Sequence, residues 1–295
     1  MRKHVRRLTG FAVLVMMLVV FSSLGLAADK TITLLQTSDI HGNIYPWSYK
    51  IGEADDDVGL AKVNSVVKEV KKENPNTLLL DSGDIIQGST LTSIFKDRED
   101  VENPMMETMN YMGYDAMVLG NHEFNFGLPT LERIIAEANF PVLSANITYK
   151  NDGSNYMKPY VIKEVDGVNV GILGLTTPNI PIWDGDKVDS LDFHDMSKIA
   201  EKYIPQMQDE GADVIVGLAH AGLEGRHHES GGDKIRKVIE NNPEITVVLT
   251  GHDHEKVNTI VNGVLVAAPE DMGNQVVRVD LKLNENDGEW EVTDK

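Results

Sequence analysis

Five short polar segments constrain the fold of this chain more than any other feature, because each contains side chains that bind metals. Four of them directly follow an apolar, β-branched run, which predicts that they lie where strands end. In an open α/β sheet, ligands bind beside the carboxyl ends of the strands. The segments therefore predict one shared metal site. They are Asp39-Ile40-His41, Gly83-Asp84, Gly120-Asn121-His122-Glu123, Ala219-His220 and Gly251-His252-Asp253-His254.

The donor types in these segments restrict the choice of metal. They are carboxylates, imidazoles and one side-chain amide, and the chain contains no cysteine. Oxygen and nitrogen donors without thiolate favour Mn, Zn, Fe, Co or Ni over softer ions. The ligand types leave the choice among these five metals open.

Apolar runs and helical spacing alternate along the chain and predict an α/β fold. This alternation predicts two packed sheets with helices outside them, a layered α/β sandwich. The last three strands are expected to be antiparallel neighbours. Strands are expected at 31–38, 77–80, 116–119, 142–147, 160–165, 168–175, 214–218, 246–250, 259–261, 264–268 and 275–283, and helices at 58–72, 104–111, 128–138 and 196–210.

Three further patterns have simpler interpretations than a functional site. The helix at 104–111 begins a run of methionines at helical spacing, Met105, Met106, Met109 and Met112, which we interpret as core packing. The triplet Asn146-Ile147-Thr148 matches a glycosylation acceptor, which we interpret as a chance match. His194, His227 and His228 lie outside the five segments, and we expect them to be solvated.

Residues 1–27 have the pattern of a cleaved signal peptide. Basic residues precede an uncharged stretch from Phe11 to Ser22, and the small residues of Gly25-Leu26-Ala27 provide a cleavage site. An uncleaved anchor is the alternative, but the apolar core is shorter than the roughly 20 residues that a spanning helix needs. Arg6-Arg7 also permits twin-arginine export. We expect an exported protein, periplasmic, wall-associated or extracellular, without stable membrane insertion after cleavage.

The acidic charge of the mature chain restricts its partners. Loss of the leader removes four basic residues and no acidic ones, so the formal net charge changes from -19 to about -23. A strongly negative surface repels polyanions, which argues against nucleic-acid polymers and anionic membranes. A small phosphate ester remains possible, because two divalent ions make the pocket locally positive and salt screens distant charge beyond roughly 8 Å.

Taken one at a time, the segments differ in how specific they are. Asp39 and His41 lie two apart in what we expect to be an extended stretch, so both side chains would point to one ion, and His252 and His254 repeat this spacing. Asp84 could instead be a turn or helix-cap aspartate. A lone His220 could be a buried core histidine. Asn121 beside His122 is the most informative pair, because an amide and an imidazole after a buried strand contribute little to packing.

In this order the segments resemble those of calcineurin-like metallophosphoesterases, over essentially the whole mature chain. Four stretches are similar to the catalytic domain of exported 5'-nucleotidases and 2',3'-cyclic-nucleotide 2'-phosphodiesterases. These stretches are residues 37–43, 113–116, 120–125 and 144–147. The resemblance implies a four-layer αββα sandwich of two mixed sheets, the metallo-dependent phosphatase fold, over a domain at 31–285.

The resemblance also implies a role for each site residue. Asp39, His41 and His254 would hold one divalent ion, Asn121, His220 and His252 would hold the other, and Asp84 would bridge them. The two ions would activate a water for in-line attack on phosphorus. His122 would steady the phosphoryl group and protonate the leaving oxygen.

Two departures from the family pattern bear on the substrate. Family 5'-nucleotidases have an aspartate three residues after the catalytic histidine, and this chain has Asn125, which can accept the imidazole N–H but stabilises the imidazolium less. Asn125-Phe126-Gly127-Leu128 is typical of the cyclic phosphodiesterases. The nucleotidases also have a second, C-terminal domain that binds the base and phosphate, which we expect to be absent from the given sequence, because nothing after residue 283 could supply it. The chain is then either the metal-binding half of a longer protein or a stand-alone phosphoesterase with looser base selection.

We therefore expect a secreted dinuclear-metal hydrolase of small phosphate esters, a 2',3'-cyclic-nucleotide 2'-phosphodiesterase/3'-nucleotidase. The first alternative is a 5'-nucleotidase or UDP-sugar hydrolase of the same family. The second is a non-catalytic exported binding protein. All seven expected ligands are present, which argues against the second alternative, because loss of catalysis is usually accompanied by loss of ligands.

Overall fold

The computed structural model describes residues 29–48, 50–225 and 234–295. The expected leader at 1–27, together with His227 and His228, lies outside the described residues. Within those ranges, no helix combines the length and the apolar character needed to cross a membrane.

The first of two large sheets contains the N-terminal strands and the last two strands of the chain. Its order is β16-β15-β1-β4-β5-β6. The strands β1, β4, β5 and β6 are parallel, whereas β15 pairs antiparallel with β1 and with β16. Their bounds are β1 Lys30–Thr37, β4 Thr77–Asp81, β5 Ala116–Val118, β6 Val142–Leu143, β15 Val277–Asn286 and β16 Glu289–Asp294.

The second large sheet contains strands from the later half of the chain. Its order is β13-β14-β12-β11-β9-β8, with a parallel centre and antiparallel edge strands. The bounds are β8 Tyr160–Val165, β9 Val168–Thr176, β11 Val214–His220, β12 Val247–Leu249, β13 Val257–Val261 and β14 Val264–Ala268. Two small ribbons pair β2 Trp47–Ser48 with β3 Glu53–Ala54, and β7 Ile147–Tyr149 with β10 Leu191–Phe193.

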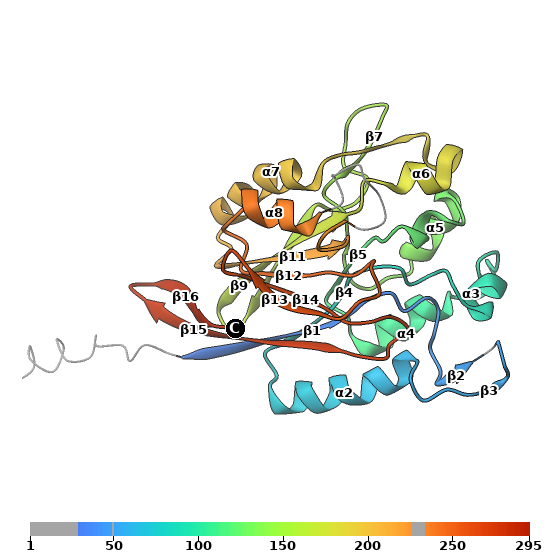
Figure 1. Cartoon of the computed structure of the whole chain (residues 1–295), viewed down its shortest axis with the longest axis horizontal. Coiled ribbons are helices and arrows are strands. Elements are labelled where there is room, and N and C mark those ends of the chain that lie inside the picture. Colours follow the sequence, from blue (N-terminus) through green and yellow to red (C-terminus); the bar gives the residue numbers. More distant parts are fainter. Residues whose placement is uncertain (1–28, 49, 226–233) are drawn as a thin grey trace, which may run out of the picture.

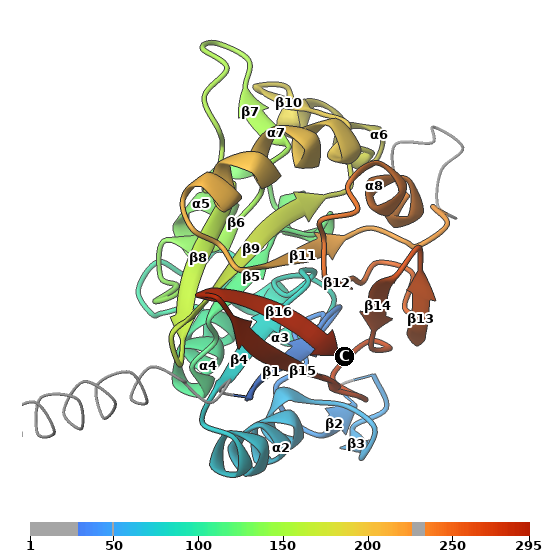
Figure 2. The same ribbon diagram turned by 90° about the vertical axis from the view of Figure 1, so that its left-hand side faces the viewer.

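Helices cover the outer face of each sheet (Figure 1). In both views α7 and α8 lie on one side of the molecule and α2 and α4 on the other, with the two sheets between them (Figure 2). The helix bounds are α2 Leu60–Glu73, α3 Thr90–Phe95, α4 Pro104–Met112, α5 Leu128–Ile135, α6 Ile180–Asp184, α7 Met196–Asp209 and α8 Ile235–Asn241, with short 3-10 turns η2 His122–Phe124 and η3 Gly185–Val188. This layering confirms the expected sandwich of two mixed sheets.

Strand alternation assigns the apolar side chains to three core layers. In β1, Leu34 belongs to the cluster between the two sheets and Leu35 to the cluster under α2 and α4. A third cluster joins the second sheet to α7 and α8, with Ile215 on the sheet side and Ala200 on the helix side. Because successive strand residues point to opposite faces, a fully apolar strand can be buried on both faces.

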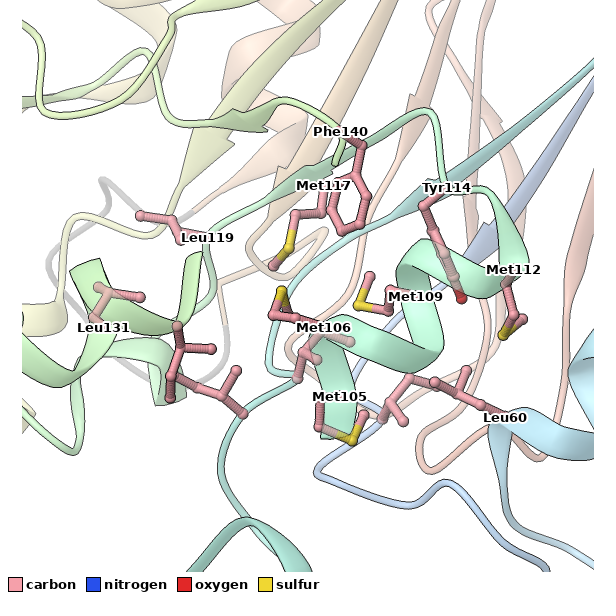
Figure 3. Packing of buried hydrophobic residues seen from close by; sticks show 14 of the residues in the cluster. Leu60, Met105, Met106, Met109, Met112, Tyr114, Met117, Leu119, Leu131 and Phe140 are labelled. Carbon is pink, nitrogen blue, oxygen red and sulfur yellow. The ribbon is translucent and has the colours of Figure 1, made fainter. Parts of the chain in front are cut away.

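The methionines of α4 pack in the core, as the sequence predicts. All four, Met105, Met106, Met109 and Met112, are buried. Figure 3 shows them lying against Leu60, Tyr114, Met117 and Phe140. Asn103 caps the helix by accepting from the Met105 N–H, and Pro104 occupies the first turn. The four methionines therefore contribute core volume.

The structure corrects the expected strand at 142–147. Two short strands, β6 and β7, replace it, and they lie in different sheets. Between them the Asn146 side chain bonds the backbone of Thr176 through both polar atoms, at 2.7 and 2.8 Å. Asn146 is fully buried, which makes it unsuitable as a glycosylation acceptor and supports the chance interpretation of that triplet.

The C-terminal strands also differ from expectation. The hairpin of β13 and β14 is antiparallel, but β15 leaves that sheet and pairs with β1 instead of β14. Neither β16 nor α8 was predicted from the sequence. The pairing of β15 with β1 depends on residues more than 240 positions apart, such as Leu34 and Val279, and local patterns do not encode it.

Candidate metal centre

The five polar segments meet at one edge of the sandwich. Asp39, Asp84 and Asn121 lie two or three residues beyond β1, β4 and β5 in the first sheet. His220 is the last residue of β11, and His252 lies three residues beyond β12, both in the second sheet. The carboxyl ends of the parallel strands of both sheets therefore supply the donors, where the sequence predicted them.

The backbone at Asp39 and His41 is not extended, so the expectation of an extended stretch at this pair was wrong. Their φ angles are 53° and 50°, in the left-handed region. The Asp39 and His41 N–H groups donate to the carbonyls of Gly83 and Asp84, both at 2.9 Å, so the loop after β4 holds this conformation. His252 and His254 also have positive φ angles, 79° and 54°, and their side chains join different donor groups.

Among the described residues, three overlapping sets of donors could each hold a metal ion. They are Asp39, His41 and His254; His41, Asp84 and His122; and Asp84, His220 and His252, with donor atoms within 4.8 Å of one another in each set. Asn121 Oδ1 lies 3.1 Å from His220 Nε2, beside the last set. The structure thus brings all seven expected ligands together, and Asp84 belongs to two of the three sets, one with His41 and one with His220.

Outward hydrogen bonds orient two of the imidazole rings, and an outward contact with a carboxylate orients a third. The Nδ1 atoms of His41 and His220 lie 3.0 and 2.6 Å from the carbonyls of Gln87 and Ser82, and His254 Nδ1 lies 3.3 Å from the Asp271 carboxylate. An N–H directed outward leaves the Nε2 lone pair directed inward, as metal-binding histidines require. His41 Nε2 and His254 Nε2 lie 3.1 Å apart. In the metal-free protein a proton can join these two nitrogens, and a divalent ion would take its place, because only the neutral imidazole is a ligand. The donor set therefore fits divalent ions.

Burial and close imidazoles determine the pKa values of the carboxylates. Burial alone would raise the pKa of Asp84, but His220, at 3.1 Å, together with His122 and His41 lowers it. The pKa of Asp39 is also lowered, because the hydrogen bond from His254 and the charge of His220 outweigh the effect of burial. Both carboxylates are therefore ready to accept cations.

His220 shows the reciprocal effect. Burial alone would lower its pKa, but Asp84 raises the pKa of His220 to about 10 in the metal-free protein. A metal ion must displace that proton, because only the neutral imidazole is a ligand. The buried ion pair consequently holds His220 and Asp84 together before metal binds.

Glu123 is a functional residue to which the sequence analysis gave no role. Its carboxylate is fully buried and accepts four backbone N–H groups, from Asp84, Ile85, Ile86 and Gly120 at 2.6–3.3 Å. Gly120 is required here, because a Cβ at this position would collide with the Asp84 carboxylate. Glu123 thereby fixes the loop that carries Asp84. The position of Glu123 next to His122 was the only indication of this role in the sequence.

His122 and Asn125 lie beside the donor groups and line the same cavity. His122 Nδ1 lies 2.6 Å from Asn125 Oδ1, and His122 Nε2 lies 4.0 Å from Asp84 Oδ2. The His122 side chain is 36% exposed, so its Nε2 is accessible to a ligand. The cavity measures about 420 Å³ and is lined by Asp84, Asn121, His122, Asn125, Trp183, His252, Asp253 and His254.

The remaining described histidine outside the segments is His194. It is half-buried, and its Nε2 lies 2.7 Å from Thr148 Oγ1, so the expectation that it is solvated was wrong. Two larger cavities of the described residues, of about 570 and 940 Å³, are lined by none of the seven donors. The donor groups therefore locate the candidate site better than cavity size does.

Comparisons with known proteins show what this chain is similar to. A family model described as calcineurin-like phosphoesterase matches residues 32–256. The trifunctional nucleotide phosphoesterase protein YfkN of Bacillus subtilis is 34% identical over 300 residues, covering 91% of this chain and 20% of that protein. A 2',3'-cyclic-nucleotide 2'-phosphodiesterase/3'-nucleotidase of Haemophilus influenzae is 30% identical over 319 residues, covering 99% of this chain and 49% of that protein.

A solved structure agrees with these sequence relatives. The crystal structure of the calcineurin-like phosphoesterase YfkN from Bacillus subtilis superposes with a TM-score of 0.84 at 33% identity, and the match covers 90% of this chain and 89% of that chain. This chain spans about half or less of the length of the curated relatives just named.

Proposed function

Because this chain belongs to the calcineurin-like phosphoesterase family, we propose that it is a dinuclear-metal hydrolase of nucleotide phosphate esters. The family uses a pair of divalent ions, and the His and Asp groups of this chain can hold them. The observation that carries the proposal is the position of Asp84, whose carboxylate is shared between two donor groups.

In this proposal Asp39, His41 and His254 hold one ion, and Asn121, His220 and His252 hold the other. Asp84 would be shared by both, in agreement with its 3.1 Å distance from His220 and its donor set with His41. The ions, when bound, neutralise phosphoryl charge and activate the attacking water. Their identity among Mn, Zn, Fe, Co and Ni is open, because affinity for these donors depends on availability as much as geometry.

His122 acts as the general acid in this mechanism. Asn125 Oδ1 accepts the Nδ1–H of His122, so Nε2 carries the proton that moves to the leaving oxygen. After transfer the ring is neutral and keeps its Nδ1 proton. The partial exposure of His122 in the cavity permits Nε2 to contact a bound ester.

We infer a preference for 2',3'-cyclic nucleotides. The names of the relatives and the sequence Asn125-Phe126-Gly127-Leu128 support it. Trp183, which is 38% exposed at the cavity wall, offers an aromatic face on which a base could stack. The expected leader supports export, and we assign the phosphoesterase domain to residues 31–285, to which β16 adds an edge strand.

A 5'-nucleotidase of the same family is distinguished by its product. The proposal expects 2',3'-cyclic AMP to be opened to 3'-AMP or converted to adenosine faster than 5'-AMP is dephosphorylated, as measured by chromatography of the metal-loaded protein. Faster release of phosphate from 5'-AMP would assign the site to the alternative.

The central test of the function is His122→Ala. Metal content should remain at two ions per chain, while turnover falls by roughly 100-fold or more, the scale of a lost general acid. His194→Ala is the matched control, because this half-buried imidazole bonds Thr148 away from the site and its loss should leave turnover unchanged. A fully metal-loaded parent without turnover on any phosphate ester would overturn the enzyme proposal and favour a binding protein.

A further inference from the structure

A buried carboxylate lies directly behind the Asn125 that holds His122. Asn125 Nδ2 donates to Asp184 Oδ1 and Oδ2 at 3.1 and 3.2 Å, and Asp184 is only 4% exposed. Asp184 is the last residue of α6 and lies 59 positions along the chain from Asn125. The described contacts therefore form a continuous series from His122 through Asn125 to Asp184.

The series has a fixed direction, because an amide has one acceptor end and one donor end. The Asp184 carboxylate is only an acceptor, so it requires the Nδ2 end of Asn125. The Oδ1 end must then face His122, where it lies 2.6 Å from Nδ1. With the amide reversed, Oδ1 would face a carboxylate and Nδ2 would face an imidazole N–H, and both contacts would be repulsive.

We propose that Asp184 is a positioning residue that sets the tautomer of His122 by fixing the orientation of the Asn125 amide. The inference rests on the proposed function, because it concerns the nitrogen of His122 that exchanges a proton with substrate. With Nδ1–H held by Asn125, Nε2 is the atom that gains and loses the proton. Without Asp184 the amide can rotate, and His122 can hold its neutral-state proton on either nitrogen.

Lys187 completes the arrangement from the turn that follows α6. Its Nζ donates to Asp184 Oδ1 at 3.1 Å and to the Asn125 carbonyl at 2.9 Å. One ammonium thus balances the Asp184 charge and ties η3 to the backbone beside His122. The cation explains how a carboxylate can be kept almost fully buried here, since buried charges are normally paired.

The geometry makes Asn125 and Asp184 a matched pair, which permits a reciprocal test. Asn125→Asp places two carboxylates about 3 Å apart, at the present amide-carboxylate distance, and repulsion should displace the acceptor from His122. Adding Asp184→Asn restores one donor and one acceptor at that contact, and the aspartate at 125 again accepts from His122 Nδ1. We expect Asn125→Asp to lower kcat by roughly 10- to 100-fold, a part of the general-acid contribution, and the double variant to recover most of it.

Single substitutions at Asp184 separate positioning from packing. Asp184→Leu removes the acceptor and should lower kcat by about 10-fold with little change in KM, because the metals and the cavity are untouched. Asp184→Asn keeps an oxygen that can accept from Asn125 but adds a donor end, so it should lower kcat less than Asp184→Leu. Metal content and melting temperature, measured for every variant, identify any variant that has lost its fold. If Asp184→Leu does not fold, the comparison of Asn125→Asp with the double variant still tests the inference.

A second readout does not depend on turnover. Nitrogen NMR of histidine-labelled, zinc-loaded protein at alkaline pH, where imidazole is neutral, reports the tautomer of each ring. The His122 signal, assigned by its loss in His122→Ala, should show the Nδ1–H form in the parent and a mixture in Asp184→Leu.

Three results would overturn the inference: a mixed His122 tautomer in the parent, parental kcat in a folded Asp184→Leu variant, or a double variant no better than Asn125→Asp. Absence of turnover in the metal-loaded parent would instead refute the proposed function. The NMR result would still decide between a fixed and a mixed tautomer.

Discussion

The two sheets contribute to the candidate metal centre in chemically different ways. The loops of the first sheet provide both carboxylates and the amide, together with His41 and His122. The second sheet provides three of the imidazoles. The two expected ligands that carry negative charge both come from the first sheet. These two ligand sets are Asp39, His41, Asp84 and Asn121 from the first sheet, and His220, His252 and His254 from the second.

The two halves also differ in what holds their loops. The first-sheet loops support one another, since Glu123 accepts four N–H groups from the loops after β4 and β5. The end of β12 and the loop after it also bond to the first sheet: the Leu249 and Thr250 carbonyls accept from Ser82 and Gln36, and the His252 N–H donates to Asp39. The comparison indicates a preorganised anionic half that the imidazole half completes.

The largest expected effect comes from the residue shared by both donor groups. Asp84→Asn replaces a carboxylate that can contact two ions with an amide that carries no charge. We expect fewer than two ions per chain and a loss of turnover of roughly 1000-fold, about 4 kcal/mol of barrier. Elemental analysis and steady-state kinetics measure the two effects. The control is Asp56→Asn, an exposed carboxylate paired with Lys62. Two retained ions would show that Asp84 does not join the halves.

The next largest effect tests whether hydrogen bonds hold the first-sheet loops more firmly than the second-sheet loops. Glu123→Gln leaves an N–H₂ group facing backbone N–H donors, so we expect a loss of about 3 kcal/mol in unfolding free energy and roughly 10- to 100-fold in metal affinity. The matched change in the second sheet is Thr250→Val, which removes one hydrogen bond to the Ala221 carbonyl and should cost about 1 kcal/mol. Denaturant titration compares them. Equal losses would contradict the idea that the first half is the preorganised one.

The sequence contained most of the information about where the donors lie. Apolar runs identified the central strands, and the polar residues after them proved to be neighbours, because parallel strands end at one edge. Local pattern did not reveal the left-handed backbone at Asp39 and His41. That conformation depends on hydrogen bonds to Gly83 and Asp84, more than 40 residues away.

The supporting residues were harder to find than the ligands. Glu123 acts through backbone groups up to 39 positions away, and Asp184 through a side chain 59 positions away. A carboxylate on its own in a sequence does not show which N–H groups it will meet. The expected strand at 142–147 was wrong for the same reason, since the buried Asn146 side chain bonds Thr176 and divides it.

A smaller effect is expected at Trp183, and it tests whether the second-sheet half also binds substrate. Trp183 lies on α6, after β9 of the second sheet, with its ring centroid 5.6 Å from that of His252. If a base stacks there, Trp183→Ala should raise KM for 2',3'-cyclic AMP by about 10-fold with kcat little changed, the scale of one stacked base. Trp183→Phe should retain most of the affinity. An unchanged KM would restrict the second half to metal binding.

The smallest expected effect concerns the electrostatic cost of the anionic half. Asp81 ends β4 and is fully buried, where its Oδ1 accepts from the Gly83 N–H and its Oδ2 from Thr37. Burial, with the nearby charges of Glu123 and Asp39, raises the pKa of Asp81 well above its usual value. The protonated form therefore stabilises the fold below the ordinary Asp pKa. That contribution is lost as the pH rises through the raised pKa.

Asp81→Asn should remove this loss, because an uncharged amide of the same shape can still accept from Gly83 and donate to Thr37. The variant should match the parent at acidic pH near 4, and its advantage should grow with pH to about 1 kcal/mol at neutrality. Denaturant unfolding of both proteins with a chelator present, over a pH series, measures the difference. A constant difference across the series would mean that Asp81 carries no pH-dependent cost. Lower stability of the variant at neutral pH would mean that its charge supports the loop after β4. The anionic half would then be stabilised by its carboxylates in the absence of metal, and the preorganisation inferred from Glu123 would extend to Asp81.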